Sequence, residues 1–163
     1  MIIVIGAGPV GLAAAKEAGA DLVLEEHAEV GKPVSCAGLI SKSGIDELGV
    51  YEKSYVLNNV KGARFCSHNE HFLVKAKETK AYVVDRGLFD QSLAKGIEIK
   101  TGCRVERLDA NGAVEYRENG KMKKVDADAV ILACGPNNAL LKQIGAQYPS
   151  KDMISCAQYE MEC

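Results

Sequence analysis

The chain has 163 residues, of which 47% are hydrophobic and 26% charged, and its formal net charge is −2. This length is enough for one domain with a hydrophobic core, and no segment approaches the run of about 18 apolar residues that spans a bilayer. The mixed charges predict no basic surface for nucleic acid, so we expect no nucleic-acid partner.

The first eleven residues combine a short apolar strand, expected over residues 2–5, with a G-x-G-x-x-G pattern made by Gly6, Gly8 and Gly11. In dinucleotide-binding proteins the first glycine allows a tight turn and the second lets the backbone approach the pyrophosphate. The third lets the following helix pack on the strand. The opening pattern therefore predicts a pyrophosphate site.

An Ala-rich helix is expected over residues 9–18, directly after the glycine turn. Pro9 suits the first helical turn, where a missing N–H costs nothing, and Val10 follows it at the anion-facing end. Gly19 is a helix stop signal. The N–H groups at the start of such a helix face a bound anion.

A second apolar strand, expected over residues 21–25, ends in an acid. Glu25 lies nineteen residues after Gly6, close to the spacing of about 20 that places a carboxylate on a ribose hydroxyl. Glu26 follows it and joins it as a candidate cofactor-binding residue. The alternative is a surface turn followed by a charged strand end.

The rest of the chain predicts further strands and helices. Asn111-Gly112 and Asn119-Gly120 predict two-residue hairpin turns, in which both residues adopt positive φ, and Asp85 is expected to cap a helix. The elements expected, in chain order, are a helix over 41–48, strands over 61–67 and 71–76, an extended segment over 81–84, a helix over 87–93, a strand over 97–99, a three-stranded meander over 103–108, 113–117 and 123–125, a strand over 129–133 and a helix over 136–144.

The pattern of the six cysteines indicates a reducing compartment, and the position of the first strand bears on whether a signal peptide is present. No C-x-x-C pair occurs, so neither a zinc site nor a disulfide scaffold is predicted. The first strand begins beside Met1 and leaves no room for a signal peptide. We therefore expect a cytoplasmic protein without a metal site.

Three segments match the motifs of one protein family, in the same order. Residues 25–41, EEHAEVGKPVSCAGLIS, resemble the second-strand acid and following loop of the geranylgeranyl reductases. Residues 85–94, DRGLFDQSLA, resemble that family's "DR..FD..LA" segment, and residues 129–136, AVILACGP, its "vIxAdGp" strand end. The resemblance covers nearly the whole chain. The archaeal members, which saturate isoprenoid chains of membrane lipids, look most similar.

The resemblance implies an α/β fold: a Rossmann-like FAD-binding domain, with a parallel sheet and a β-meander crossover, plus the start of a β-rich substrate domain. Residues 1–60 and 80–150 would form the discontinuous FAD-binding domain. Residues 61–79 and 151–163 would be partial β segments of the substrate domain. The chain would then be the N-terminal part of a flavin-dependent oxidoreductase.

The resemblance also implies a set of site residues. The glycine turn would hold the FAD pyrophosphate, Glu25 the adenosine ribose, and Arg86 the flavin nucleotide, unless Arg86 is a surface arginine beside Asp85 or Asp90. Cys36 is the candidate catalytic residue near the flavin, although a thiol merely packed in its loop fits as well. The implied cofactor-binding residues are Gly6, Gly8, Pro9, Val10, Gly11, Glu25, Glu26, Cys36, Ala37, Arg86, Cys134 and Gly135.

Three departures from the family pattern limit this prediction. The first helix and the segment Leu93–Ile97 are each about one turn shorter than expected. Cys134 stands where relatives carry an aspartate that helps to position the cofactor. The chain stops at Cys163, within an expected strand over residues 153–161, and the family's later "GDAA" segment is absent.

Three functions remain open on the sequence alone. The leading one is the FAD-binding portion of an enzyme that reduces prenyl double bonds of an isoprenoid lipid, with peripheral membrane contact. The second is a non-catalytic module that binds the ADP half of a dinucleotide, completed by another polypeptide or forming a homo-oligomer. The third is an NAD-binding dehydrogenase domain, which Glu25 permits but the β-rich segment over residues 61–84 and the meander disfavour.

Overall fold

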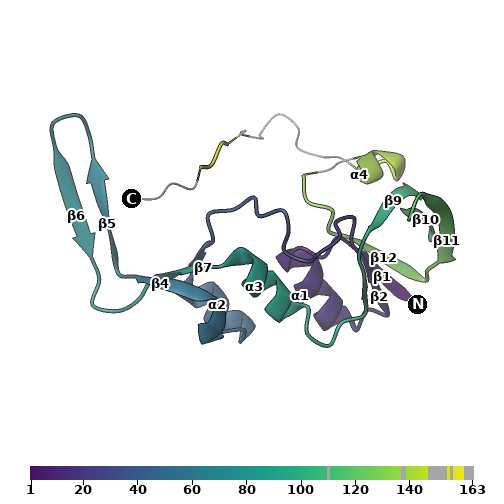
Figure 1. Cartoon of the computed structure of the whole chain (residues 1–163), viewed down its shortest axis with the longest axis horizontal. Helices are drawn as coiled ribbons and strands as arrows, with labels where there is room; N and C mark the ends of the chain where they lie inside the picture. The colour runs from purple at the N-terminus through teal and green to yellow at the C-terminus, as the bar shows by residue number, and fades with distance from the viewer. Residues whose placement is uncertain (110, 137–138, 147–153, 155, 160–163) are drawn as a thin grey trace. The chain divides into compact units, whose positions relative to one another are not determined.

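The computed structural model describes most of the chain and divides it into two compact units. We call Met1–Pro33 with Asp90–Cys163 the sheet unit, and Val34–Phe89 the hairpin unit. Figure 1 shows the elements of both, and each unit is described by itself. The residues described are 1–109, 111–136, 139–146, 154 and 156–159.

A four-stranded parallel sheet, ordered β12-β1-β2-β8, forms the centre of the sheet unit. β1 (Ile2–Ile5) lies between β12 (Ala129–Leu132) and β2 (Leu22–Leu24), and β8 (Ile99–Lys100) is the edge strand. β1 and β2 are short runs of apolar residues and are almost wholly buried. This is the composition of parallel strands that are covered on both faces.

One face of this sheet is covered by α1 (Pro9–Ala18). Its Leu12 and Ala15 are buried against Val4 and Val23 of the sheet. Pro9 occupies the first turn, and Gly19 ends the helix in a left-handed conformation with φ +59°. The predicted bounds of this helix are therefore confirmed.

The opposite face is covered by a meander of three antiparallel strands and by α4 (Ala139–Gln143), whose Leu140 joins the core on this side. Val114 of the meander is fully buried in the same cluster as Ile3 and Ile5. The predicted meander on a parallel sheet is thus confirmed. Its strands are β9 (Cys103–Leu108), β10 (Ala113–Glu118) and β11 (Lys121–Asp126).

The two turns of the meander differ from each other. Asn119 and Gly120 have φ of +50° and +76°, as predicted for a two-residue turn. The Asn111-Gly112 prediction is wrong in detail, because the Asp109 N–H donates to the Ala113 carbonyl, which is one residue too far along the chain for a two-residue turn at 111–112. The Asp109 carboxylate accepts hydrogen bonds from the N–H groups of Asn111 and Ala113 and so builds a longer turn.

The hairpin unit contains an antiparallel sheet ordered β3-β7-β4 and a separate two-stranded hairpin. In α2 the Ser41 side chain accepts a hydrogen bond from the Gly44 N–H, which caps the helix as an exposed hydroxyl can. The elements are β3 (Leu39–Ser41), α2 (Lys42–Leu48), a 3₁₀ turn (Lys53–Tyr55), β4 (Val56–Val60), β5 (Gly62–Cys66), β6 (His71–Lys75), β7 (Ala81–Val84) and α3 (Arg86–Leu93), which ends beyond the unit.

Figure 1 shows β5 and β6 as a two-stranded hairpin. Both strands are exposed, and one face of the hairpin is apolar. Phe65 and Phe72 pair across the strands and stack with their ring centroids 4.7 Å apart, and Ala63 pairs with Val74 on the same face. Phe65, Phe72 and Val74 are each at least half exposed. We call these four residues the hairpin face.

Several expected bounds need correction. The strand predicted over residues 97–99 lies at Ile99–Lys100, where it pairs with β2. β3 and β4 were not predicted, because both are short and are held by pairing with β7 rather than by an alternating pattern of their own. The predicted strand over 153–161 and part of the helix over 136–144 lie outside the described residues. The predicted division into domains follows other boundaries than the two units and stays a prediction.

Within the described ranges, no helix has the length and apolar character needed to cross a bilayer. In the same residues no group of three or more histidine, cysteine, aspartate or glutamate side chains is placed to hold a metal ion.

Candidate dinucleotide-binding site

The glycine turn lies at the carboxyl end of β1, beside the carboxyl ends of β2 and β12. The Gly6 N–H donates to the Leu24 carbonyl at 2.8 Å, which ties the turn to β2. Gly6 has φ +103°, and a Cβ there would lie 2.4 Å from the Ala133 carbonyl oxygen after β12. Parallel sheets bind ligands at this edge.

Gly11 is required by packing inside the chain. A Cβ at this position would lie 2.0 Å from the Gly6 carbonyl oxygen and 3.2 Å from the Ala133 Cβ. Only a glycine therefore allows α1 to approach the turn and β12 so closely. This is the role that the sequence pattern predicts for the third glycine.

Gly8 differs from both, because nothing in the chain lies within 4 Å of the place where its Cβ would be. Its φ of −74° and ψ of 173° are accessible to any residue. It is the N-cap of α1, yet no side chain caps this end and no acid lies in the first turn. The N–H groups at the start of α1 therefore face open space, as an anion site requires.

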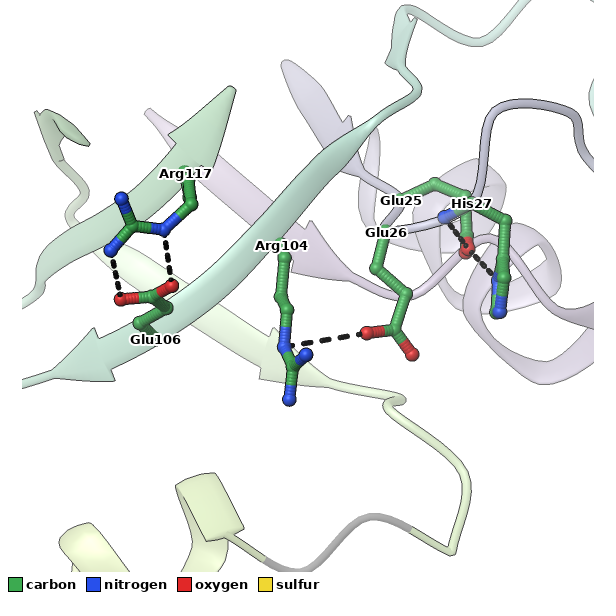
Figure 2. Close-up of polar contacts among 6 residues, drawn as sticks. All are labelled: Glu25, Glu26, His27, Arg104, Glu106 and Arg117. Carbon is green, nitrogen blue, oxygen red and sulfur yellow. Dashed lines mark hydrogen bonds and ion pairs between the residues drawn. The ribbon is translucent and has the colours of Figure 1, made fainter. Parts of the chain in front are cut away.

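Glu25 is buried and is held at both carboxylate oxygens. Oε2 accepts a hydrogen bond from the Ala7 N–H at 2.7 Å, and Oε1 accepts one from the His27 N–H at 2.9 Å. The His27 ring Nδ1 lies 2.6 Å from the same Oε1 (Figure 2). A carboxylate has about four acceptor positions, so one remains for a ribose hydroxyl.

The first residues of β9 run beside Glu25 and His27. The Gly102 N–H donates to the His27 carbonyl and the Cys103 N–H to the Glu25 carbonyl, both at 2.8 Å. Cys103 is buried, and burial raises the pKa of its thiol. The next residue, Arg104, is exposed and places its Nε 3.8 Å from Oε2 of Glu26 (Figure 2).

The sheet unit therefore brings together most of the predicted site residues. Cys134 lies next to the glycine turn, since its Cα is 3.4 Å from the place where a Cβ on Gly6 would be. It is half-buried and packs against the core, and Gly135 after it is exposed with φ +60°. The residues gathered at this edge are Gly6, Gly8, Pro9, Val10, Gly11, Glu25, Glu26, Cys134 and Gly135.

Three predicted residues belong to the hairpin unit instead. Cys36 and Ala37 are exposed in the loop before β3, and the Cys36 Sγ accepts a hydrogen bond from the Gly38 N–H at 3.5 Å. Gly38 has φ +73°, and a Cβ there would lie 2.2 Å from the Val84 carbonyl oxygen. Arg86 is half-buried at the start of α3, which Asp85 caps as predicted, by accepting from the Leu88 N–H.

Three residues at the site make contacts that were not predicted. His27 orients the Glu25 carboxylate, and its position two residues after a strand-ending acid is a local signal that could have shown this. Arg104 comes from a strand far along the chain, and nothing near Glu26 in the sequence points to it. The Ala7 N–H likewise becomes a ligand of Glu25 only through the fold.

The chain is similar over nearly its whole length to curated archaeal proteins, although no protein-family model matches it. It is 33% identical to digeranylgeranylglycerophospholipid reductase 2 of Methanosphaera stadtmanae over 98% of this chain and 46% of that protein. It is 31% identical to a digeranylgeranylglycerophospholipid reductase of Methanococcus aeolicus, over 98% of this chain and 44% of that protein. The chain thus spans less than half the length of these relatives.

Solved structures show the same fold. A geranylgeranyl bacteriochlorophyll reductase-like protein from Thermoplasma acidophilum superposes on 90% of this chain and 42% of its own with a TM-score of 0.81, at 28% identity. A flavin-dependent brominase superposes on 88% of this chain and 41% of its own, with a TM-score of 0.69 at 19% identity. The predicted α/β fold class is confirmed by these likenesses.

Proposed function

The chain is a relative of the geranylgeranyl reductases, and from this premise we propose that it is the FAD-binding portion of a flavin-dependent oxidoreductase of that type. The substrate class would be an isoprenoid lipid, as the names of its curated relatives suggest. Membrane contact and a cytoplasmic location stay predictions.

The observation that carries this proposal is the open space at Gly8. The chain itself gives no steric reason for a glycine there, whereas Gly6 and Gly11 are both required by neighbouring backbone. A dinucleotide pyrophosphate supplies a reason, because it needs close approach to the backbone at the uncapped start of α1. The oriented Glu25 carboxylate supports it, since it lies on the same sheet edge with an acceptor position to spare.

The residues of this chain would bind and orient the cofactor. The α1 N–H groups would hold the pyrophosphate and Glu25 the adenosine ribose. Bound flavin, in its reduced form, would supply the hydride for one carbon of a prenyl double bond, while the other carbon takes up a proton. Cys36, Ala37, Arg86, Cys134 and Gly135 stay predicted flavin-side residues, and Cys36 stays the candidate near the reacting atoms.

A flavin-binding titration of Gly8→Ala against the unaltered chain tests the proposal. We expect FAD to bind the unaltered chain and the alanine variant to bind at least about tenfold more weakly, because the added methyl group occupies the pyrophosphate position. The free energy of unfolding in urea should stay within about 0.5 kcal/mol, because the methyl meets nothing in the chain. No binding by the unaltered chain, or equal binding by both proteins, would contradict the proposal.

The second candidate is a non-catalytic module that binds the ADP half of a dinucleotide and is completed by another polypeptide. The hairpin face favours it, because Phe65, Phe72 and Val74 are apolar and exposed in the described residues. Competition among FAD, ADP and NAD separates the candidates. FAD should bind more tightly than ADP if the flavin half is also held, equal affinities favour the ADP module, and a preference for NAD favours the dehydrogenase.

Sedimentation velocity tests whether the hairpin face binds a second copy of this chain or a different polypeptide. If the hairpin face packs on a further polypeptide, the isolated chain should be a monomer at tens of micromolar. A dimer that Phe72→Ser dissociates would point instead to a second copy of this chain, the predicted homo-oligomer.

A further inference from the structure

We propose that Arg104 is a further cofactor-binding residue, whose guanidinium plane lies against the adenine of the bound dinucleotide. The inference rests on the proposed function, because it takes Glu25 as the acid that binds the adenosine ribose. Nothing in the sequence pattern of the glycine turn points to Arg104, which lies on β9.

Backbone hydrogen bonds fix the position of Arg104 beside the ribose acid. Cys103 donates to the Glu25 carbonyl and Gly102 to the His27 carbonyl, so β9 begins directly alongside this segment. Cys103 points into the core, and the alternation of a strand then directs Arg104 outward. Its guanidinium reaches toward Glu26, the neighbour of Glu25 (Figure 2). Adenine is joined to the ribose carbon next to a hydroxyl-bearing carbon, so the base lies within reach of side chains that flank the acid.

The guanidinium of Arg104 is not committed elsewhere. Arg104 pairs directly with Arg117 across the β9–β10 ladder, but Arg117 turns away and binds Glu106 with both Nε at 2.7 Å and Nη2 at 3.1 Å. Among the described residues, Arg104 has one ion pair, with Glu26 at 3.8 Å, which is longer than a hydrogen bond. Its donors and its flat face therefore remain available to a ligand.

Stability gives little reason for the Arg104–Glu26 pair. The side chains are 67% and 44% exposed, and an exposed ion pair at this separation contributes little to folding. A bound ligand is a better reason for an arginine at this position, because an arginine guanidinium stacks favourably on aromatic faces. Glu26 would hold the edge of the guanidinium and leave its face toward the base.

Arg107→Ala is a matched control for Arg104→Ala. Arg107 lies on the same strand, is 78% exposed and has an ion pair of the same length, 3.8 Å to Glu115. We expect Arg104→Ala to raise the dissociation constants of both FAD and ADP about fivefold to tenfold, and Arg107→Ala to leave both unchanged. Both variants should unfold in urea at the same midpoint as the unaltered chain. Arg104→Lys, which keeps the charge but loses the plane, should bind as weakly as Arg104→Ala, and the loss should persist at 0.5 M salt, a concentration at which exposed charges about 5 Å apart are screened.

Equal affinities of the Arg104→Ala and Arg107→Ala variants would overturn the inference while leaving the proposed function standing. Full rescue by Arg104→Lys, with a loss that disappears at high salt, would overturn the planar contact in favour of a charge effect. If the unaltered chain binds neither FAD nor ADP, the proposed function fails first and the inference with it.

Discussion

Gly8 and Gly11 lie three residues apart, yet a methyl group would meet open space at one and backbone at the other. The sequence pattern predicts a different role for each, close approach of a pyrophosphate for Gly8 and helix packing for Gly11. The structure shows that the fold requires a glycine at position 11 and gives no steric reason for one at position 8, where we propose that a ligand does. At the scale of the residue, loss of binding and loss of stability can therefore be separated.

Gly11→Ala should destabilise the protein, in contrast to Gly8→Ala. The new Cβ would lie 2.0 Å from the Gly6 carbonyl oxygen, so either α1 or the turn must shift. Overpacking of this kind costs about 1–3 kcal/mol. Urea unfolding followed by circular dichroism measures the change, and an unfolding midpoint equal to that of Gly8→Ala would show that the close approach is not maintained in solution.

Glu25 illustrates how much of the site the sequence could predict. Its spacing from Gly6 predicts that it is the ribose acid, because strand, turn and helix lengths are nearly constant in this arrangement. The Ala7 N–H and His27 contacts that orient its carboxylate, and Arg104 beside Glu26, were not predicted. Ala7 and Arg104 reach this site through chain folding, which leaves no local signal.

At the scale of the element, the β9–β10 turn depends on one carboxylate. Asp109 accepts hydrogen bonds from the Ala113 and Asn111 N–H groups, and these bonds hold its pKa below the ordinary value of 3.8. A depressed carboxyl pKa means that the folded state favours the ionised form. The stabilisation is complete above the unfolded pKa and is lost as the pH falls through the folded one.

Asp109→Ala should therefore destabilise the protein by a constant amount near neutral pH and by less in acid. The difference in unfolding free energy between the two proteins should begin to shrink below about pH 4–5, where the unfolded-state carboxyl begins to take up protons. Urea unfolding at pH 7 and at pH 3.5 measures this change. A difference of equal size at both pH values would mean that the ionised carboxylate does not hold the turn.

Elements with strong local signals were predicted well. The strand–glycine–helix segment and the Asn119-Gly120 turn carry their geometry in adjacent residues. β3 and β4 were not predicted, because each is stabilised by pairing with β7, which is distant along the chain. The Asn111-Gly112 turn was mispredicted because Asp109, outside the dipeptide, sets its length.

At the scale of the whole molecule, the candidate cofactor residues are distributed over both units. The glycine turn, Glu25 and Arg104 belong to the sheet unit, whereas Cys36 and Arg86 belong to the hairpin unit. ADP and FAD share the adenosine and pyrophosphate but differ in the flavin half. The two ligands should therefore affect the units differently.

Amide hydrogen exchange read by mass spectrometry tests this distribution. ADP should slow exchange in peptides that contain the glycine turn and Glu25, and should leave peptides of Val34–Phe89 unchanged. FAD should add protection around Cys36 and Arg86, because ligand contacts suppress local opening. Gly8→Ala should show neither effect at the same ligand concentration. Identical patterns for ADP and FAD would contradict a flavin-side role for the hairpin unit.

The order of the central sheet also dictates when the site can form during synthesis. β1 pairs with β12, so Ile2 pairs with Ala129, and Gly6 packs against Ala133. During synthesis β1 must wait until residues 129–132 have been made before it gains its second neighbour. At about 5–20 residues per second this delay is on the order of ten seconds. During that time β1 lacks one of its two neighbouring strands and its apolar residues are incompletely covered. This makes the segment a natural target for chaperones in the growing chain.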